Sequence, residues 1–334
     1  MNRQTTLKIK GAALLLFSIL MLTPMVSLGL NLTAIERRWY PPNGAPSVKM
    51  WGFVEDIGYC NASQTPWAPG PALTGVVDGT LSITLRNCLS EPISLIVPGL
   101  ESTLTPQTFV DSKGRTRVRA FTKEVPVDNG ITRVTYTWKN LRAGTYLYQS
   151  GSHPAKQVHM GLYGALTVGR HNKATNHTIL LFSEIDPALH ANAEAATPLN
   201  YKPKYYLING QSAEPAFSPP QTFGGRSEQT LHLRFLNAGL TTHVPTLQGP
   251  YMQIFAEDGN PYPYPKEQYS VLLPAGKTID ALWSPETDKL YPLYDRRLSM
   301  TTNGSAGGGM VQNLNVLKYF PWVLFTPAIT HNLE

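Results

Sequence analysis

The chain has 334 residues, of which 42% are hydrophobic and 15% are charged, so it can bury a sizeable core and is not a disordered polypeptide. Its formal net charge is +6, but Lys and Arg form no dense run, which excludes nucleic-acid binding through a basic stripe. The 28 prolines and 27 glycines are spread along the chain, as expected for many short strands joined by turns.

The first 29 residues have the organisation of a secretory signal peptide. An apolar run at 12–22 follows a basic start and is too short to span a bilayer comfortably. The alternative is an uncleaved N-terminal anchor, but Pro24 interrupts the apolar segment early and favours cleavage, which we place after Gly29. The basic start consists of Arg3, Lys8 and Lys10. We therefore expect an exported protein, periplasmic or extracellular, with no lipid-embedded domain after cleavage.

The chain contains two cysteines, Cys60 and Cys88. In an exported protein the expected state is a single disulfide, and closing a loop of this length would stabilise the fold by about 3–4 kcal/mol. The alternative is a pair of free thiols, one of them a metal ligand. Neither cysteine has a histidine within two residues, so we favour the disulfide.

The first half of the chain predicts alternating strands separated by turns. After a polar lead-in at 30–46, period-two patterns indicate strands at 47–56, 80–87, 132–138, 145–148 and 162–168. A polar and basic stretch at 108–125 is expected to be a loop or an exposed hairpin whose charges face solvent. The segment between the last two strands is expected to be a polar loop.

The second half continues in the same way after an expected domain boundary at 169–175. The one short helix that we predict covers 189–196, where alanines cluster. Strands are expected at 178–185, 205–211, 230–239, 254–259, 273–280, 296–301 and 310–317. The aromatic run that follows, within 319–334, is treated as a C-terminal tail, either a strand tucked against the fold or the stub of a linker.

Several short sequence motifs resemble those of a known family. The words GTYLYQS at 144–150 and GLYGALTVG at 161–169 are similar to the last two strands of the first cupredoxin domain of bacterial multicopper oxidases. Later words of the second domain follow in order, namely YYLING at 205–210, TLHLRFLNAG at 230–239, IFAEDG at 254–259 and LPAGKTID at 273–280. The resemblance implies an all-β fold of two successive Greek-key cupredoxin-like β-sandwiches, at 45–170 and 171–318.

The resemblance also implies copper, but the expected ligands differ. Matched on the family's motifs, the positions of the four first-domain histidines hold Ile96, Pro98, Gln149 and Gly151. None of these side chains is an imidazole, the ligand that such copper sites use in pairs. The third domain that supplies further ligands in three-domain members is not expected here.

The eight histidines contain no pair at i, i+2 spacing. His153 and His159 lie in the loop where the family places its copper-facing residues, and they are our candidate metal ligands. We interpret His243 as a structural histidine and His232 as facing solvent or an interface. Asp258 and Asp280 are expected in a turn and at a strand end. No spacing indicates a Ser-His-Asp site or a phosphate loop, so we predict no catalytic or organic cofactor-binding residue.

Three functions are compatible with this pattern. The resemblance implies an exported copper-dependent oxidoreductase that oxidises metals or phenols and reduces oxygen, but the missing ligands predict that this chain alone is not an autonomous oxidase. The second is a copper-free β-sandwich binding or structural module. The third is one part of a split oxidase, formed as a homo-oligomer or with a copper-bearing partner domain.

Overall fold

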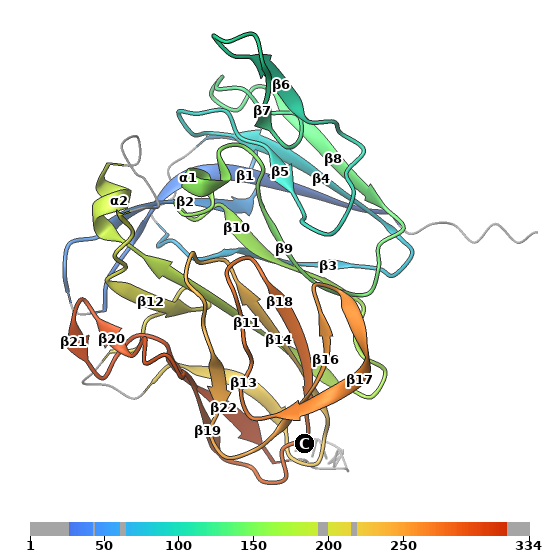
Figure 1. Cartoon of the computed structure of the whole chain (residues 1–334), viewed down its shortest axis with the longest axis vertical. Coiled ribbons are helices and arrows are strands. Elements are labelled where there is room, and N and C mark those ends of the chain that lie inside the picture. Colours follow the sequence, from blue (N-terminus) through green and yellow to red (C-terminus); the bar gives the residue numbers. More distant parts are fainter. Residues whose placement is uncertain (1–26, 43, 61–64, 193–199, 215–218, 319–334) are drawn as a thin grey trace, which may run out of the picture.

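The computed structural model describes residues 27–42, 44–60, 65–192, 200–214 and 219–318. Nearly all of its regular elements are strands, and they form two β-sandwiches that lie one against the other (Figure 1). The prediction of an all-β fold with two successive sandwiches is confirmed. No helix among the described residues is long and apolar enough to cross a membrane.

The first sandwich consists of two four-stranded sheets, with strand orders β2-β1-β4-β8 and β3-β10-β9-β5. Its core follows from period-two alternation: on β4, Leu81, Ile83 and Leu85 are fully buried between the sheets, and the residues between them are not aimed at the core. The strands are β1 (Ser27–Trp39), β2 (Val48–Glu55), β3 (Gly70–Gly75), β4 (Thr80–Asn87), β5 (Leu95–Ile96), β8 (Arg133–Lys139), β9 (Gly144–Ser150) and β10 (Tyr163–Val168).

The predicted polar lead-in at 30–46 is wrong, because most of it is strand β1. This strand pairs in parallel with β4 from Ser27 onward and antiparallel with β2. Its charged residues lie near the end, whereas Leu32 and Ala34 face the core, so the polar composition hid a period-two pattern. Residues 1–26 are outside the described part of the chain, and the signal peptide stays a prediction. Cleavage after Gly29 would remove the start of β1.

The second sandwich pairs an eight-stranded sheet, in the order β17-β16-β18-β14-β11-β12-β20-β21, with the four-stranded sheet β13-β22-β19-β15. Its core is a separate cluster of aliphatic and aromatic side chains. The strands are β11 (Asn176–Ile185), β12 (Tyr205–Ile208), β13 (Gln221–Arg226), β14 (Leu231–Asn237), β15 (Pro245–Leu247), β16 (Met252–Glu257), β17 (Asn260–Gln268), β18 (Thr278–Trp283), β19 (Leu290–Asp295), β20 (Thr301–Thr302), β21 (Ser305–Ala306) and β22 (Val311–Leu317).

The basic stretch at 108–125 contains a two-stranded hairpin, β6 (Gln107–Val110) and β7 (Thr116–Ala120), which projects from the first sandwich (Figure 1). Two of its arginines pair with Asp111, as expected for a solvated charged face.

Two short helices complete the fold, α1 (Pro154–Gln157) and α2 (Pro187–Ala191). Helix α1 lies in a segment predicted as loop. Helix α2 begins two residues before the predicted helix, because Asp186 caps its N-terminus and Pro187 occupies its first turn. Residues 193–199 of that prediction lie outside the described residues.

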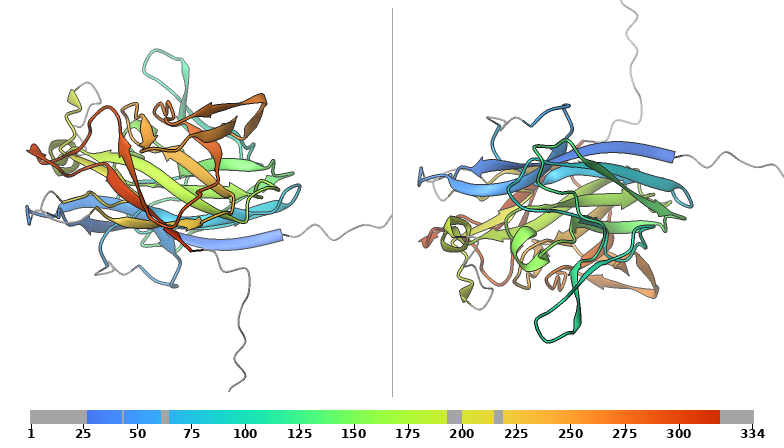
Figure 2. Two further views of the ribbon diagram at one scale, coloured as in Figure 1. Left: turned by 90° about the horizontal axis from the view of Figure 1, so that it is seen from below. Right: turned by 90° about the horizontal axis from the view of Figure 1, so that it is seen from above.

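A third apolar cluster joins the two sandwiches. It takes side chains from both, and the edge-on views of Figure 2 show the strands of the two halves lying in adjacent layers. Trp39 of the first sandwich illustrates the fit: its ring lies 4.8 Å from that of Tyr205, and its Nε1 donates to the carbonyl of Gly210 at 3.0 Å. Apolar contacts of this kind help to fix the sandwiches relative to each other.

Candidate functional site

The positions where copper ligands were expected are filled by strand pairing and packing. Ile96 on β5 pairs with Gln149 on β9, and Gly151 is the first residue after β9. A Cβ atom at Gly151 would lie only 2.7 Å from Cγ2 of Ile96 and 2.8 Å from Oγ of Ser94. A histidine at residue 151 therefore has no room, and these residues do not fit the multinuclear copper centre that the resemblance implies.

A buried cluster of neutral polar groups lies beside these positions. Ser150 Oγ donates to Oε1 of Gln157 at 2.6 Å, and Ser152 Oγ donates to Ser94 Oγ at 3.1 Å. The amide of Gln157 also donates to the carbonyl of Pro92 at 3.0 Å. These groups satisfy one another, so the cluster stabilises the loop between β9 and β10 without needing an ion.

The two metal ligands predicted from the sequence lie in different environments. His153 precedes α1, is exposed and has a left-handed backbone conformation with φ 41°. His159 is buried, and its ring lies 4.6 Å from that of His190 on α2 and 5.2 Å from that of Tyr201. The structure thus brings His159 to the second sandwich, and the pairing of His153 with His159 stays a prediction.

Both rings of the His159–His190 pair are held neutral. Burial lowers the pKa of His190 to about 3; the neighbouring His159 adds to this, and the hydrogen bond with the Lys49 carbonyl opposes it. Burial also lowers the pKa of His159, against the opposing fields of Asp186 and Glu184.

The tautomer of His190 is fixed by its hydrogen bond. A carbonyl can only accept, so Nδ1 of His190 carries the proton that it donates to Lys49 O at 2.8 Å, and Nε2 keeps its lone pair. The Nε2 atoms of both His159 and His190 are buried without a hydrogen-bond partner in the described structure.

A chain of contacts and hydrogen bonds leads from this pair to ionised groups of the second sandwich. Tyr201, whose ring meets His159 edge-on, donates its hydroxyl to Oε2 of Glu184 at 2.8 Å. The other oxygen of Glu184 accepts from Nε2 of His243, whose Nδ1 donates to Asp295 at 2.9 Å. The expectation that His243 is a structural, satisfied histidine agrees with these contacts.

His243 is held as a cation between its two carboxylates. Burial lowers its pKa, but hydrogen bonds to Asp295 and Glu184 outweigh burial and raise the pKa to about 8. Burial raises the pKa of Glu184 and of Asp295, yet hydrogen bonding to His243 lowers both overall.

A second buried ionic cluster lies at the other end of the interface. His232 donates from Nε2 to Asp280 at 2.7 Å, and Arg234 donates to Thr145 Oγ1 of the first sandwich at 2.7 Å. The expectation of a strand-end Asp280 is wrong, since it lies within β18 opposite Arg234 and is 1% exposed. His232 is buried at this interface, which agrees with the second of the two alternatives expected for it and not with exposure to solvent. The cluster borders a cavity of about 180 Å³.

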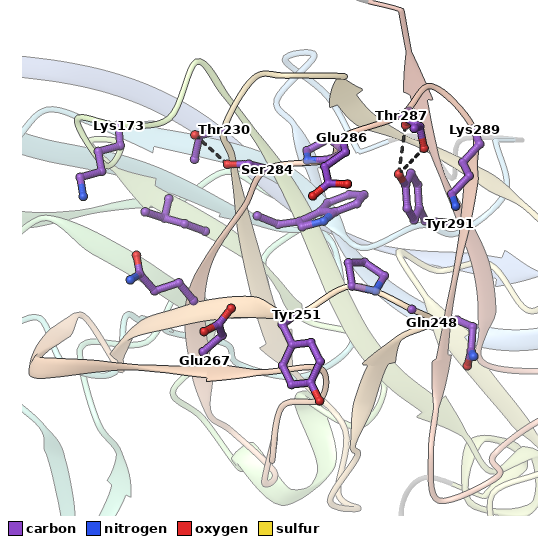
Figure 3. Close-up of a pocket in the computed structure, with 16 residues that line it drawn as sticks. Lys173, Thr230, Gln248, Tyr251, Glu267, Ser284, Glu286, Thr287, Lys289 and Tyr291 are labelled. Atoms are coloured by element: carbon purple, nitrogen blue, oxygen red, sulfur yellow. Dashed lines mark hydrogen bonds between the residues drawn. The ribbon is translucent and has the colours of Figure 1, made fainter.

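The surface of the second sandwich also carries an open groove of about 710 Å³ (Figure 3). Glu267 and Glu286 point into it together with Lys289 and the aromatic ring of Tyr251. Because acidic and basic groups share the groove, its charge favours no single class of ligand.

Solved structures with the same architecture settle the fold. The blue copper oxidase from Nitrosomonas europaea superposes with a TM-score of 0.70 at 18% identity, over 91% of each chain. The multicopper oxidase mgLAC gives 0.70 at 19% identity, again over 91% of each. The chain has the fold of the multicopper oxidases. The copper nitrite reductase from Nitrosomonas europaea shares it, with a TM-score of 0.63 at 17% identity over 87% of this chain and 94% of that one.

These likenesses confirm the resemblance inferred from the sequence words, at the level of the fold. No protein-family model matches the chain, and no curated protein matches it either. Among the described residues, no group of three or more His, Cys, Asp or Glu side chains is arranged to hold a metal ion. The chain thus combines the multicopper-oxidase fold with the buried polar groups described above.

The sequence pattern does not point to four residues of these clusters, namely His190, Tyr201, Glu184 and Asp295. One signal was available: the apolar strand β11 ends in Glu184-Ile185-Asp186, so two acids follow a run that is otherwise buried. Acids in such a position are buried at a cost and usually have partners.

Proposed function

We propose that this protein is an exported module with the multicopper-oxidase fold that acts by binding and does not reduce oxygen on its own. The observation that carries the proposal is the packing at Gly151, where Ile96 and Ser94 occupy the space that a ligand side chain would need. Strand pairing of Ile96 with Gln149 occupies the same region, so the four positions matched to the family's first-domain ligands offer no imidazole to a multinuclear copper centre.

The cysteines support the same conclusion. Cys60 and Cys88 form a disulfide, which confirms the sequence prediction. A sulfur in a disulfide carries no thiolate charge, so neither cysteine can serve as the thiolate ligand of a blue-copper site. One-electron transfer from a substrate through copper thiolate to oxygen therefore has no entry point among the described residues.

The test is oxygen uptake by the purified full chain after incubation with copper under reducing conditions and removal of the excess. We expect no oxygen consumption with ferrous iron, cuprous ion or a phenol beyond that of the heat-denatured protein with the same copper. A blue absorption band, or oxygen uptake that persists over many turnovers and needs the folded chain, would overturn the proposal.

Export is tested separately. We expect the protein in the periplasmic or extracellular fraction of the producing cell, with a mature N-terminus near residue 30. N-terminal sequencing of that fraction checks the cleavage point, and recovery of an intact residue 1 from a membrane pellet would contradict it.

A further inference from the structure

We propose that His159 and His190 together bind a single d-block cation, copper or zinc, at the interface between the two sandwiches. This site goes beyond the proposed function, which denies a multinuclear redox centre and a thiolate-ligated blue-copper site. It also differs from the sequence prediction, because its second ligand comes from α2 of the second sandwich and not from His153.

The first argument is the state of the donor atoms. Metal ions bind the unprotonated nitrogen of a neutral imidazole, and a backbone carbonyl on the opposite nitrogen is the usual device that orients such a ligand. His190 has this arrangement, with the carbonyl of Lys49 2.8 Å from Nδ1. Among the described residues, neither its Nε2 nor that of His159 has a hydrogen-bond partner.

The second argument is energetic. His159 is 7% exposed and His190 is 1% exposed, so their unpaired nitrogens have no access to bulk water. Burying a polar atom without a partner is unfavourable, and the two adjacent rings each carry such an atom. A cation shared by both nitrogens removes both penalties.

The third argument is the local field. Glu184 and Asp186 each raise the pKa of His159, so both carboxylates favour positive charge at that ring. Both are nearly fully buried, and Asp186 accepts hydrogen bonds from the backbone N–H groups of Ala188 and Lys202. A cation at the histidine pair would therefore be stabilised by acids that are already in place.

The donor set indicates the kind of ion. Two imidazole nitrogens without a thiolate suit copper and zinc, whereas calcium and magnesium require oxygen ligands. Tyr201 lies beside His159, but its hydroxyl is engaged by Glu184 and burial raises its pKa, so the phenol stays protonated and the protein supplies two nitrogens.

The experiment is equilibrium dialysis of the full-length protein, stripped of metal, against Zn²⁺ and, under a reductant, against Cu⁺, with the bound ion counted by atomic absorption. We expect one tightly bound ion per chain. His159→Phe keeps a ring in place, and His190→Asn keeps an N–H near Lys49 O; each removes one donor nitrogen and should weaken binding by about tenfold or more.

The matched control is His153→Asn, which replaces the exposed histidine of the same loop by a residue that tolerates its left-handed backbone. We expect unchanged binding. Equal loss in this variant would overturn the proposal in favour of a His153–His159 site, and unchanged binding in both buried-site variants, or no bound ion in the wild type, would overturn it outright.

A measurement on the wild type keeps the test decisive if a variant fails to fold. X-ray absorption of the zinc-loaded protein should show two imidazole nitrogens around the ion, and a first shell without imidazole refutes the site. The two proposals fail separately: oxygen uptake would overturn the proposed function, whereas the ion count and the ligand shell test only the histidine pair.

Discussion

Replacing His243 by Gln should destabilise the protein strongly. The imidazolium is 0% exposed and donates to Glu184 through one nitrogen and to Asp295 through the other. The variant would leave two buried carboxylates facing each other without their cation. Breaking a buried ion pair from one side costs about 3–5 kcal/mol, so we expect a loss of that size in the free energy of unfolding at pH 6.

The same histidine should make stability fall at alkaline pH. Its pKa is 6.5 in the unfolded chain and about 8 when folded, so its contribution is complete below pH 6.5 and is lost as the pH rises through 8. The interval corresponds to about 2 kcal/mol. At the acid side, Glu184 and Asp295 have lowered pKa values when folded, so their contribution is present near neutrality and is lost as the pH falls through those values.

The assay is urea unfolding followed by near-ultraviolet circular dichroism at pH 6 and pH 9. Between pH 6 and pH 9 the wild type should lose about 2 kcal/mol relative to His243→Gln, which starts lower. Buried histidines with lowered pKa values, such as His190, gain stability over the same interval, but they do so equally in both proteins. His177→Gln serves as control, because burial lowers the pKa of His177 to about 4 in the folded protein, so its replacement should leave the fall relative to His243→Gln in place. A fall of the same size in His243→Gln and in the wild type would refute the reasoning.

Three further predictions test other parts of the fold. Arg234→Met should lower the free energy of unfolding by about 3–5 kcal/mol, because it removes the donors to Thr145 and the guanidinium beside Asp280. Protease cleavage at 169–175 should then become faster. Unchanged cleavage would contradict a role of Arg234 in joining the sandwiches. Gly151→Ala should lower the thermal midpoint, at a cost of about 1–3 kcal/mol, because the new methyl overlaps Ile96; an unchanged midpoint would show that the loop can move. Reducing the disulfide should cost about 3–4 kcal/mol in urea unfolding, and equal stability in oxidised and reduced protein would contradict this value.

The fold was accessible from the sequence because its signals are local. Alternation on β4 and the turn residues around β9 and β10 identify strands within a few positions, and the order of such words identifies the architecture. Strand β1 was missed because its last residues are charged and mask the alternating Leu32 and Ala34. The alternation of Leu32 and Ala34 identifies a strand only once the pairing of β1 with β4 is known, and the polar composition of the segment suggested a loop.

The candidate site was only partly accessible, for a physical reason. His159 was singled out from its loop, but its neighbour His190 lies on a different sandwich, and no spacing along the chain encodes a contact between sandwiches. The environment of Asp280 was missed in the same way, since a strand acid opposite an arginine is recognised only once the register of β14 and β18 is known.

Some of the polar groups that escaped prediction lie between the sandwiches, and their chemistry explains it. The residues that fill each sandwich core by alternation are apolar. Inside the second sandwich, Glu184, His243 and Asp295 are buried together because each has a partner of opposite charge. Between the sandwiches, donors from one half can meet acceptors from the other, as Arg234 does with the hydroxyl of Thr145 and His190 with the carbonyl of Lys49. Buried polar groups at this interface stay satisfied only if both sandwiches keep their relative position. The unpaired nitrogens of His159 and His190 depart from that rule, and this departure makes the pair a candidate for a ligand.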